Sequence, residues 1–447
     1  MQETNKFYIY SILCFLILST SNSYSVNFII YPFLLILFLC YGIYKRKSLV
    51  ELYFLTYFFS LEILSELSFL NLINSIPILM MIIHLILIKG KSKLNLKKYK
   101  IIFLYTVLLL FISKFLSFIR FEFDIYSTIN LFFLLIVIYF YSNTFTLNKY
   151  YSLLNTLVLI SYFISVRVLI AFFNGENLLN IDSQNTVESA AIYNYIYKAT
   201  FYISSYFFLI GIGLISSIYY FLQKKSLFYL IGIILTFSVM LLNANLSAII
   251  GLLISLIYLL VILKKISFKL IVLSIIFTLI LGSFLLSKLS YGDLIISRLS
   301  FEDFSSLTFR FSVFKNSLYM YFSDLIIFLF GIGSESTLRF SDYELIKNIK
   351  YNSISNKSEG AIDSNWLTFL IENGIFLFTI ITALITISFL NKNNDSFSKL
   401  NSSLVLFFTI TGFTQIFVYA KVGSIFYLLL VSTFLIKYNY DYSRRCK

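Results

Sequence analysis

Proline is nearly absent from this sequence, with two prolines in 447 residues, and charged residues are scarce as well. The charged share is 13%, about half of that in a soluble domain. Hydrophobic residues make up 59% and aromatic residues 19%, and the mean hydropathy is +0.88. A water-soluble core cannot absorb this much apolar surface. The composition therefore excludes a soluble protein and predicts an integral membrane protein.

Metal ligands and disulfide partners are also few. The chain has one histidine, His84, and three cysteines, of which Cys14 and Cys40 fall in apolar runs and Cys446 lies in the basic tail. No DxD motif and no metal-ligand spacing occurs. We therefore expect no metal site, no cofactor and no disulfide framework, and we interpret His84 as a buried, hydrogen-bonded histidine.

Positive charge is present, and its distribution predicts the topology. The net charge is +14, but no basic stripe or RNA-binding pattern appears, so a nucleic-acid partner is not expected. Instead, the basic residues form short blocks between apolar runs, such as 45–47, 89–100 and Lys224-Lys225. The positive-inside rule places these blocks and both termini in the cytoplasm.

Fourteen apolar runs are long enough to span a membrane. They lie near 8–24, 27–44, 50–69, 74–89, 101–119, 127–143, 151–173, 199–221, 226–243, 246–263, 268–288, 365–390, 402–419 and 423–437. The predicted fold is all-α and polytopic, with about fourteen transmembrane helices. Residues 1–288 form a bundle of about eleven helices, 289–364 form a large external loop, and 365–447 form three helices and a basic cytoplasmic tail.

Two external segments exceed ordinary connectors. The loop near 174–198 is 25 residues long and leans acidic, and the loop at 289–364 is 76 residues long. Loops of the second length are usually functional or disordered. Its apolar stretch at 317–336 is too interrupted to span and suits a short helix at the membrane interface. Arginines beside such a surface suit a lipid-linked diphosphate, and a carboxylate can deprotonate an incoming sugar hydroxyl.

Two motifs carry a resemblance to a known family. Residues 310–336, RFSVFKNSLYMYFSDLIIFLFGIGSES, resemble the arginine, amphipathic segment and G-x-G turn of bacterial O-antigen polymerases and ligases. Residues 363–378, DSNWLTFLIENGIFLF, are similar to the D/H-N-x-x-L-x-x-L-x-E-x-G helix of the same families. Ligases of this superfamily carry a histidine just before the asparagine, whereas this chain has Ser364, preceded by Asp363. The resemblance therefore favours a polymerase.

The resemblance implies a metal-independent glycosyltransferase that polymerises polyprenyl-diphosphate-linked oligosaccharide repeats at the external face of the inner membrane. Its partners would be that lipid-linked substrate, membrane lipid and a chain-length regulator protein. By this resemblance, Arg310 would hold the diphosphate, assisted by Arg298, Arg339 or Arg167. Asp363 would be the catalytic base.

Other functions and plainer roles remain open at this stage. An O-antigen ligase is one alternative, and a flippase of lipid-linked oligosaccharides is another, although a flippase predicts two pseudo-symmetric halves and short external loops. Asp363 would also serve as a helix N-cap, and Arg310 and Arg167 would also suit snorkelling to the interface. Gly374 would permit close helix packing or admit a lipid chain, and we favour packing. Lys114 lies inside an apolar span, where charges are costly and often functional.

Overall fold

The computed structural model describes most of the helical parts of the chain. The described residues are 33, 36–44, 48–60, 68–87, 97–120, 125–174, 204–242, 246–263, 314–315, 318–319, 321–322, 324–332, 364–390, 396–413, 425–433 and 435–436. Helix is the regular secondary structure of these ranges, and they contain no strand. The all-α prediction is confirmed for them. The chain divides into two compact units.

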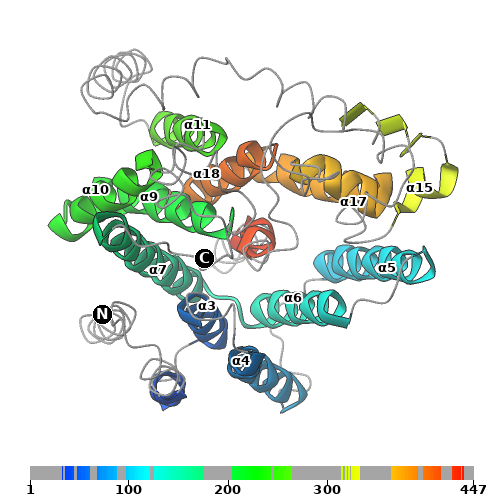
Figure 1. The fold of residues 1–447 in the computed structure, drawn as a ribbon, viewed down its shortest axis with the longest axis horizontal. Helices are drawn as coiled ribbons and strands as arrows, with labels where there is room; N and C mark the ends of the chain where they lie inside the picture. The colour runs from blue at the N-terminus through cyan, green and yellow to red at the C-terminus, as the bar shows by residue number, and fades with distance from the viewer. Residues whose placement is uncertain are drawn as a thin grey trace, which may run out of the picture. The chain divides into compact units, whose positions relative to one another are not determined.

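The first unit comprises residues 1–95, 129–243 and 424–447. It contains α3 (Leu49–Ser60), α4 (Ser68–Leu87), most of α6 (Ile125–Thr144), α7 (Leu147–Asn174), α9 (Ser204–Lys224) and α10 (Leu227–Leu242). Helix α7 packs against α9 and α10, and α9 packs against α10 (Figure 1). Helix α3 packs against α4 and α7.

Small residues let α7, α9 and α10 approach each other closely, as is common between membrane helices. Gly213 of α9 faces the side chain of Ser161, and Gly232 of α10 faces the ring of Tyr162. The Tyr162 hydroxyl is hydrogen-bonded to Ser217 Oγ at 2.6 Å. These three helices are therefore joined by side chains that fill the space left by glycine.

A buried carboxylate links α3 to α7 through hydrogen bonds. Glu51 is 2% exposed, and its Oε2 accepts hydrogen bonds from Ser152 Oγ at 3.0 Å and from Thr156 Oγ1 at 3.4 Å. In the same unit, His84 is exposed and its ring lies edge-on to Phe140, with centroids 5.5 Å apart. The expectation of a buried histidine was wrong, because the apolar residues around it face outward from α4.

The second unit comprises residues 96–128 and 244–423. It contains α5 (Lys97–Arg120), α11 (Leu246–Ile262), α15 (Leu325–Phe330), α17 (Asn365–Leu390) and α18 (Ser396–Thr411). Helix α11 runs along α18, where Ser403 Oγ donates to the carbonyl of Ser255 at 2.7 Å. Helix α17 packs against α15, α5 and α18 (Figure 1).

Most predicted apolar runs correspond to helices, but the number of spans stays a prediction. Two of the described helices, Leu147–Ile170 and Asn365–Phe389, have the length and apolarity needed to cross a membrane, and six shorter apolar helices accompany them. The runs near 8–24 and 268–288 lie outside the described residues.

Candidate functional site

The residues predicted to bind and activate substrate fall largely outside the described part of the chain. Asp363, Arg298, Arg310 and Arg339 are not described, and neither is the loop at 174–198. Arg167 lies within α7, but its side chain is not described. Their roles therefore remain predictions. What the structure does describe is a short helix within the large loop, α15, the helix that follows the loop, α17, and their neighbours in the second unit.

The short helix α15 begins and ends with well-defined caps. Asp324 has extended backbone angles, and its Oδ1 accepts the amide hydrogen of Ile326 at 2.7 Å, which makes it the N-cap. At the other end, the Gly331 amide donates to the Ile327 carbonyl at 2.8 Å. The interrupted apolar stretch at 317–336 thus contains a six-residue helix, and the prediction of a short helix there is confirmed. Its depth in a membrane stays a prediction.

Ser364 is the N-cap of α17. Its Oγ accepts the amide hydrogen of Leu367 at 3.5 Å, and its carbonyl accepts that of Thr368 at 2.9 Å. The expectation that Asp363 would cap this helix was wrong by one residue, because serine and aspartate cap helices about equally well. With Ser364 in the cap, Asp363 is not needed to begin the helix.

The start of α17 is also tied to the end of α18. The Trp366 indole Nε1 donates a hydrogen bond to the Thr409 carbonyl at 2.7 Å. The backbone amide of Asn365 donates one to the Gly412 carbonyl at 2.9 Å. These two bonds hold the point at which the chain enters α17. They leave the first turn of α17 with a defined position against α18.

Two glycines, one within the large loop and one inside α17, adopt backbone angles that favour glycine. Gly331, after α15, has φ +81°, and Gly374, inside α17, has φ +73° and ψ 176°. Residues with a Cβ rarely adopt such positive φ values. Helix α17 is therefore interrupted at Gly374, between its first turns and its long apolar part.

The same two glycines allow the two chain segments to touch backbone to backbone. A Cβ on Gly331 would overlap the backbone at 372–373, and a Cβ on Gly374 would overlap the backbone at 329–330. The Ile332 amide also donates to the Ile371 carbonyl at 2.9 Å. The G-x-G and E-x-G motifs thus meet in space, and the expectation that Gly374 permits close packing is confirmed. We call this contact the glycine junction.

A hydrophobic cluster stabilises the glycine junction from one side. It consists of Tyr321, Ile327, Ile332, Leu367 and Ile371. The Tyr321 hydroxyl donates to the Phe328 carbonyl at 2.8 Å. Burial raises the pKa of Tyr321 to about 12, so this hydroxyl stays protonated and remains a donor at physiological pH.

Three polar side chains lie on one face of α17 and are buried. Asn365, Thr368 and Glu372 have exposed fractions of 0%, 1% and 0%. Their spacing of three and four residues places them one above another on the helix. Polar groups inside membrane proteins are costly and often mark a functional site. The i, i+3, i+7 spacing is visible in the sequence, and sequence reasoning that followed the acids alone missed it.

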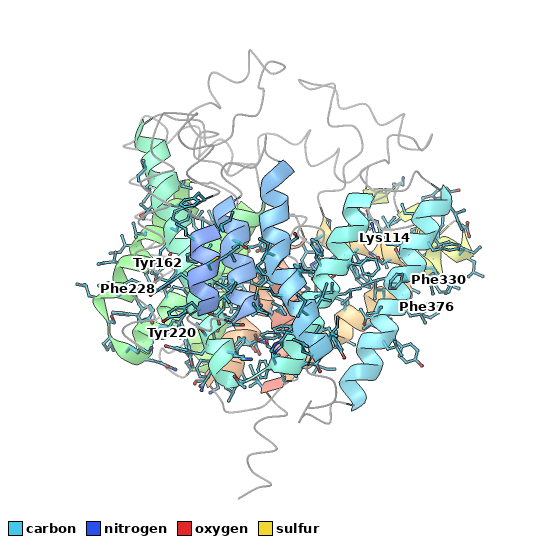
Figure 2. The ribbon with its side chains drawn as sticks, turned by 90° about the horizontal axis from the view of Figure 1, so that it is seen from below. Lys114, Tyr162, Tyr220, Phe228, Phe330 and Phe376 are labelled. Carbon is cyan, nitrogen blue, oxygen red and sulfur yellow. The ribbon has the colours of Figure 1, made fainter. Side chains whose placement is uncertain are left out.

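Helix α5 contributes one contact and one cation to this region. Ser113 Oγ donates to the Glu372 carbonyl at 2.9 Å. The next residue, Lys114, is half-buried, whereas apolar residues such as Leu108, Phe111 and Phe115 are exposed on α5. Figure 2 shows Lys114 together with Phe330 and Phe376, whose rings are 5.7 Å apart.

The described residues offer no obvious cation site. Within the ranges that the structure describes, no three His, Cys, Asp or Glu side chains lie close enough to share a metal ion. These residues instead form the glycine junction, with the buried polar face of α17 beside it.

Comparison with known proteins matches this same region. A family model described as O-antigen ligase matches residues 230–382, which include α11, α15 and the interrupted part of α17. No curated protein matches the chain, and no solved structure matches it. The matched range contains both motifs that meet at the glycine junction. Residues 230–382 are therefore similar to the O-antigen ligase family, and this similarity supports a relation to the O-antigen polymerase/ligase superfamily.

Proposed function

We propose that this protein is a polymerase that joins polyprenyl-diphosphate-linked oligosaccharide repeats into O-antigen or a similar surface polysaccharide at the external face of the membrane. The family model that matches residues 230–382 is consistent with both ligase-like and polymerase-like glycan transfer. The observation that carries the choice is Ser364. It occupies the position where the ligases of the resemblance have histidine, and its oxygen is engaged in capping α17.

The proposed reaction is a glycosyl transfer. A sugar hydroxyl of the incoming repeat attacks the anomeric carbon of the growing glycan, and the bond from that carbon to the diphosphate breaks. The hydroxyl proton passes to Asp363, and the diphosphate leaves on its polyprenyl carrier. Arg310 would neutralise the leaving group, assisted by Arg298, Arg339 or Arg167, because guanidinium groups bind phosphate oxygens through two parallel hydrogen bonds.

The framework of the second unit supports this proposal. The segment that carries Arg310 leads into α15, and Asp363 directly precedes the cap of α17. The glycine junction holds α15 against α17, so the middle of the large loop is fixed to the helix that follows it. Reacting groups on these two segments would thus start from a common rigid base, which is what catalysis by positioning requires.

Surface polysaccharide from a strain lacking the gene tests the polymerase proposal. Loss of a polymerase leaves single repeat units attached at the cell surface. Loss of a ligase or a flippase leaves essentially none. Restoration of long chains by the plasmid-borne gene is the control, and a surface with no repeat units at all would contradict the proposal.

Two substitutions test the assigned roles. Arg310→Lys keeps the charge but loses the planar fork, so polymer should fall sharply at unchanged protein level. Asp363→Asn should abolish polymer, because the amide cannot take up the proton. The matched control is Ser364→Ala, which removes the cap at a cost of about 1 kcal/mol but leaves the acid in place. Full-length polymer from the Asp363→Asn protein would exclude Asp363 as the base, and strict divalent-ion dependence in purified reactions would contradict the metal-free scheme.

A further inference from the structure

A lysine surrounded by tyrosines lies at one end of the α7, α9 and α10 group, in the first unit. The Lys224 Nζ is 5.0 Å from the ring centroid of Tyr151, 5.5 Å from that of Tyr220 and 5.8 Å from that of Tyr229. It also donates a hydrogen bond to the Tyr151 hydroxyl. We call these four residues the tyrosine cluster.

The hairpin between α9 and α10 builds this cluster. Lys225 has φ 51° and reverses the chain, so that Tyr229 of α10 returns to Lys224. Tyr220 precedes Lys224 by one helical turn, and its ring contacts those of Tyr151 and Tyr229 at 5.5 and 5.2 Å. Figure 2 shows Tyr220 on the same side of the unit as Tyr162 and Phe228, whose tilted rings have centroids 5.4 Å apart.

The cluster combines an accessible cation with a buried hydroxyl that lacks a partner. Lys224 is exposed, whereas Tyr220 is fully buried. Among the described residues, the Tyr220 hydroxyl has no hydrogen-bond partner. By contrast, the Tyr162 hydroxyl nearby is paired with Ser217. Buried hydroxyls are normally satisfied, and an exception indicates a missing water, ion or ligand.

We propose that the tyrosine cluster binds the phosphate of an anionic phospholipid head group. Lys224 supplies the charge and the tyrosine hydroxyls supply hydrogen bonds. Exposed apolar side chains of α10, Leu227, Phe228 and Ile231, begin directly beside the cluster and offer a surface for acyl chains. The charge pattern of the sequence places the Lys224-Lys225 turn in the cytoplasm, and the cytoplasmic leaflet is the one rich in anionic lipid.

This site is independent of the glycosyl-transfer proposal, because every residue in it belongs to the first unit. A free phosphate ion would share the cation and the hydroxyls but would not use the apolar surface of α10. A phospholipid uses both, so the lipid is the ligand to which the geometry points.

Native mass spectrometry of the purified full-length protein tests the proposal. Delipidated protein is titrated with phosphatidylglycerol or with phosphatidylcholine of the same acyl chains. Lys224→Gln should weaken retention of phosphatidylglycerol about tenfold, as loss of one charge-assisted contact implies. The control Lys225→Gln removes the same charge one residue away, from a side chain that lies over Phe221 instead, and should change retention little. Equal losses in both variants, or equal retention of the two lipids, would overturn the proposal.

Tyr220→Phe gives a second test that does not depend on the fate of Lys224. Removing a hydroxyl that has no internal partner should leave the melting temperature of lipid-free protein unchanged or raised. The stabilisation produced by added phosphatidylglycerol should shrink. A destabilised lipid-free protein that still retains phosphatidylglycerol would show that the hydroxyl has an internal role. Millimolar inorganic phosphate that stabilises the protein as strongly as the lipid would also contradict the proposal.

Discussion

Two glycines of the first unit meet a different kind of neighbour from two glycines of the second unit. In the first unit, Gly42 and Gly232 face the ends of side chains, those of Leu52 and Tyr162. In the second unit, Gly331 and Gly374 face backbone, and both have positive φ. A side chain that is crowded can change rotamer, whereas a crowded backbone can move only if its whole helix moves. The first arrangement packs helices, and the second fixes one specific geometry between α15 and α17.

The buried acids of the two units also differ, in the number of polar side chains that lie beside them on the same helix. Glu51 accepts hydrogen bonds from two hydroxyls of α7 and tethers one helix to another. Glu372 lies on α17 with Asn365 and Thr368, as part of a continuous buried polar face. A single tethered carboxylate is explained by packing. A row of polar groups along a membrane-length helix is better explained by a site.

The largest expected effect comes from Gly374→Ala. The Gly374 angles, φ 73° and ψ 176°, are almost restricted to glycine and cost a residue with a Cβ roughly 1–3 kcal/mol, before the overlap with the backbone at 329–330 is counted. We expect this variant to lose long-chain polymer, as judged by gels of surface polysaccharide at matched protein level. Gly42→Ala is the control, since only the end of the Leu52 side chain must move, and it should retain most of its polymer. Similar results for both variants would remove the distinction between the two arrangements.

A pair of isosteric substitutions compares the buried acids. Glu372→Gln should lower the rate of polymerisation in membranes by about ten- to hundredfold, the equivalent of roughly 1–3 kcal/mol at a buried polar group. Glu51→Gln should instead lower the free energy of unfolding by about 1 kcal/mol, because a neutral amide accepts the Ser152 and Thr156 hydrogen bonds less strongly. Its activity per folded molecule should be normal. An active Glu372→Gln protein would leave the polar face of α17 without a role.

Much of the helical framework follows from apolar run length alone. The run near 365–390 is α17, and the runs near 226–243 and 246–263 lie within a residue of α10 and α11. Run length works here because a helix is the one structure that satisfies every backbone group in an apolar solvent.

The glycine junction did not follow from the sequence, for a physical reason. Glycine is common in membrane helices, so Gly374 gives no local sign that its helix is interrupted. The interruption depends on Leu329 and Phe330, which lie more than forty residues away along the chain. The cap of α17 was ambiguous for a simpler reason, since Asp363 and Ser364 are adjacent and both cap well.

The smallest expected effect comes from Tyr321→Phe, which keeps the ring in the hydrophobic cluster and removes one hydrogen bond to the Phe328 carbonyl. The cost should be about 0.5–1.5 kcal/mol in the free energy of unfolding. Because that hydrogen bond steadies α15 beside the glycine junction, polymer length should also fall by a few-fold at most. Tyr141→Phe is the matched control, because it removes a hydrogen bond of the same 2.8 Å length, to Ser432, in the first unit. Chemical unfolding of the two purified variants should give similar losses of stability, while only Tyr321→Phe shortens the polymer. Equal polymer lengths would mean that the junction tolerates a looser α15, and would confine its importance to the two glycines themselves.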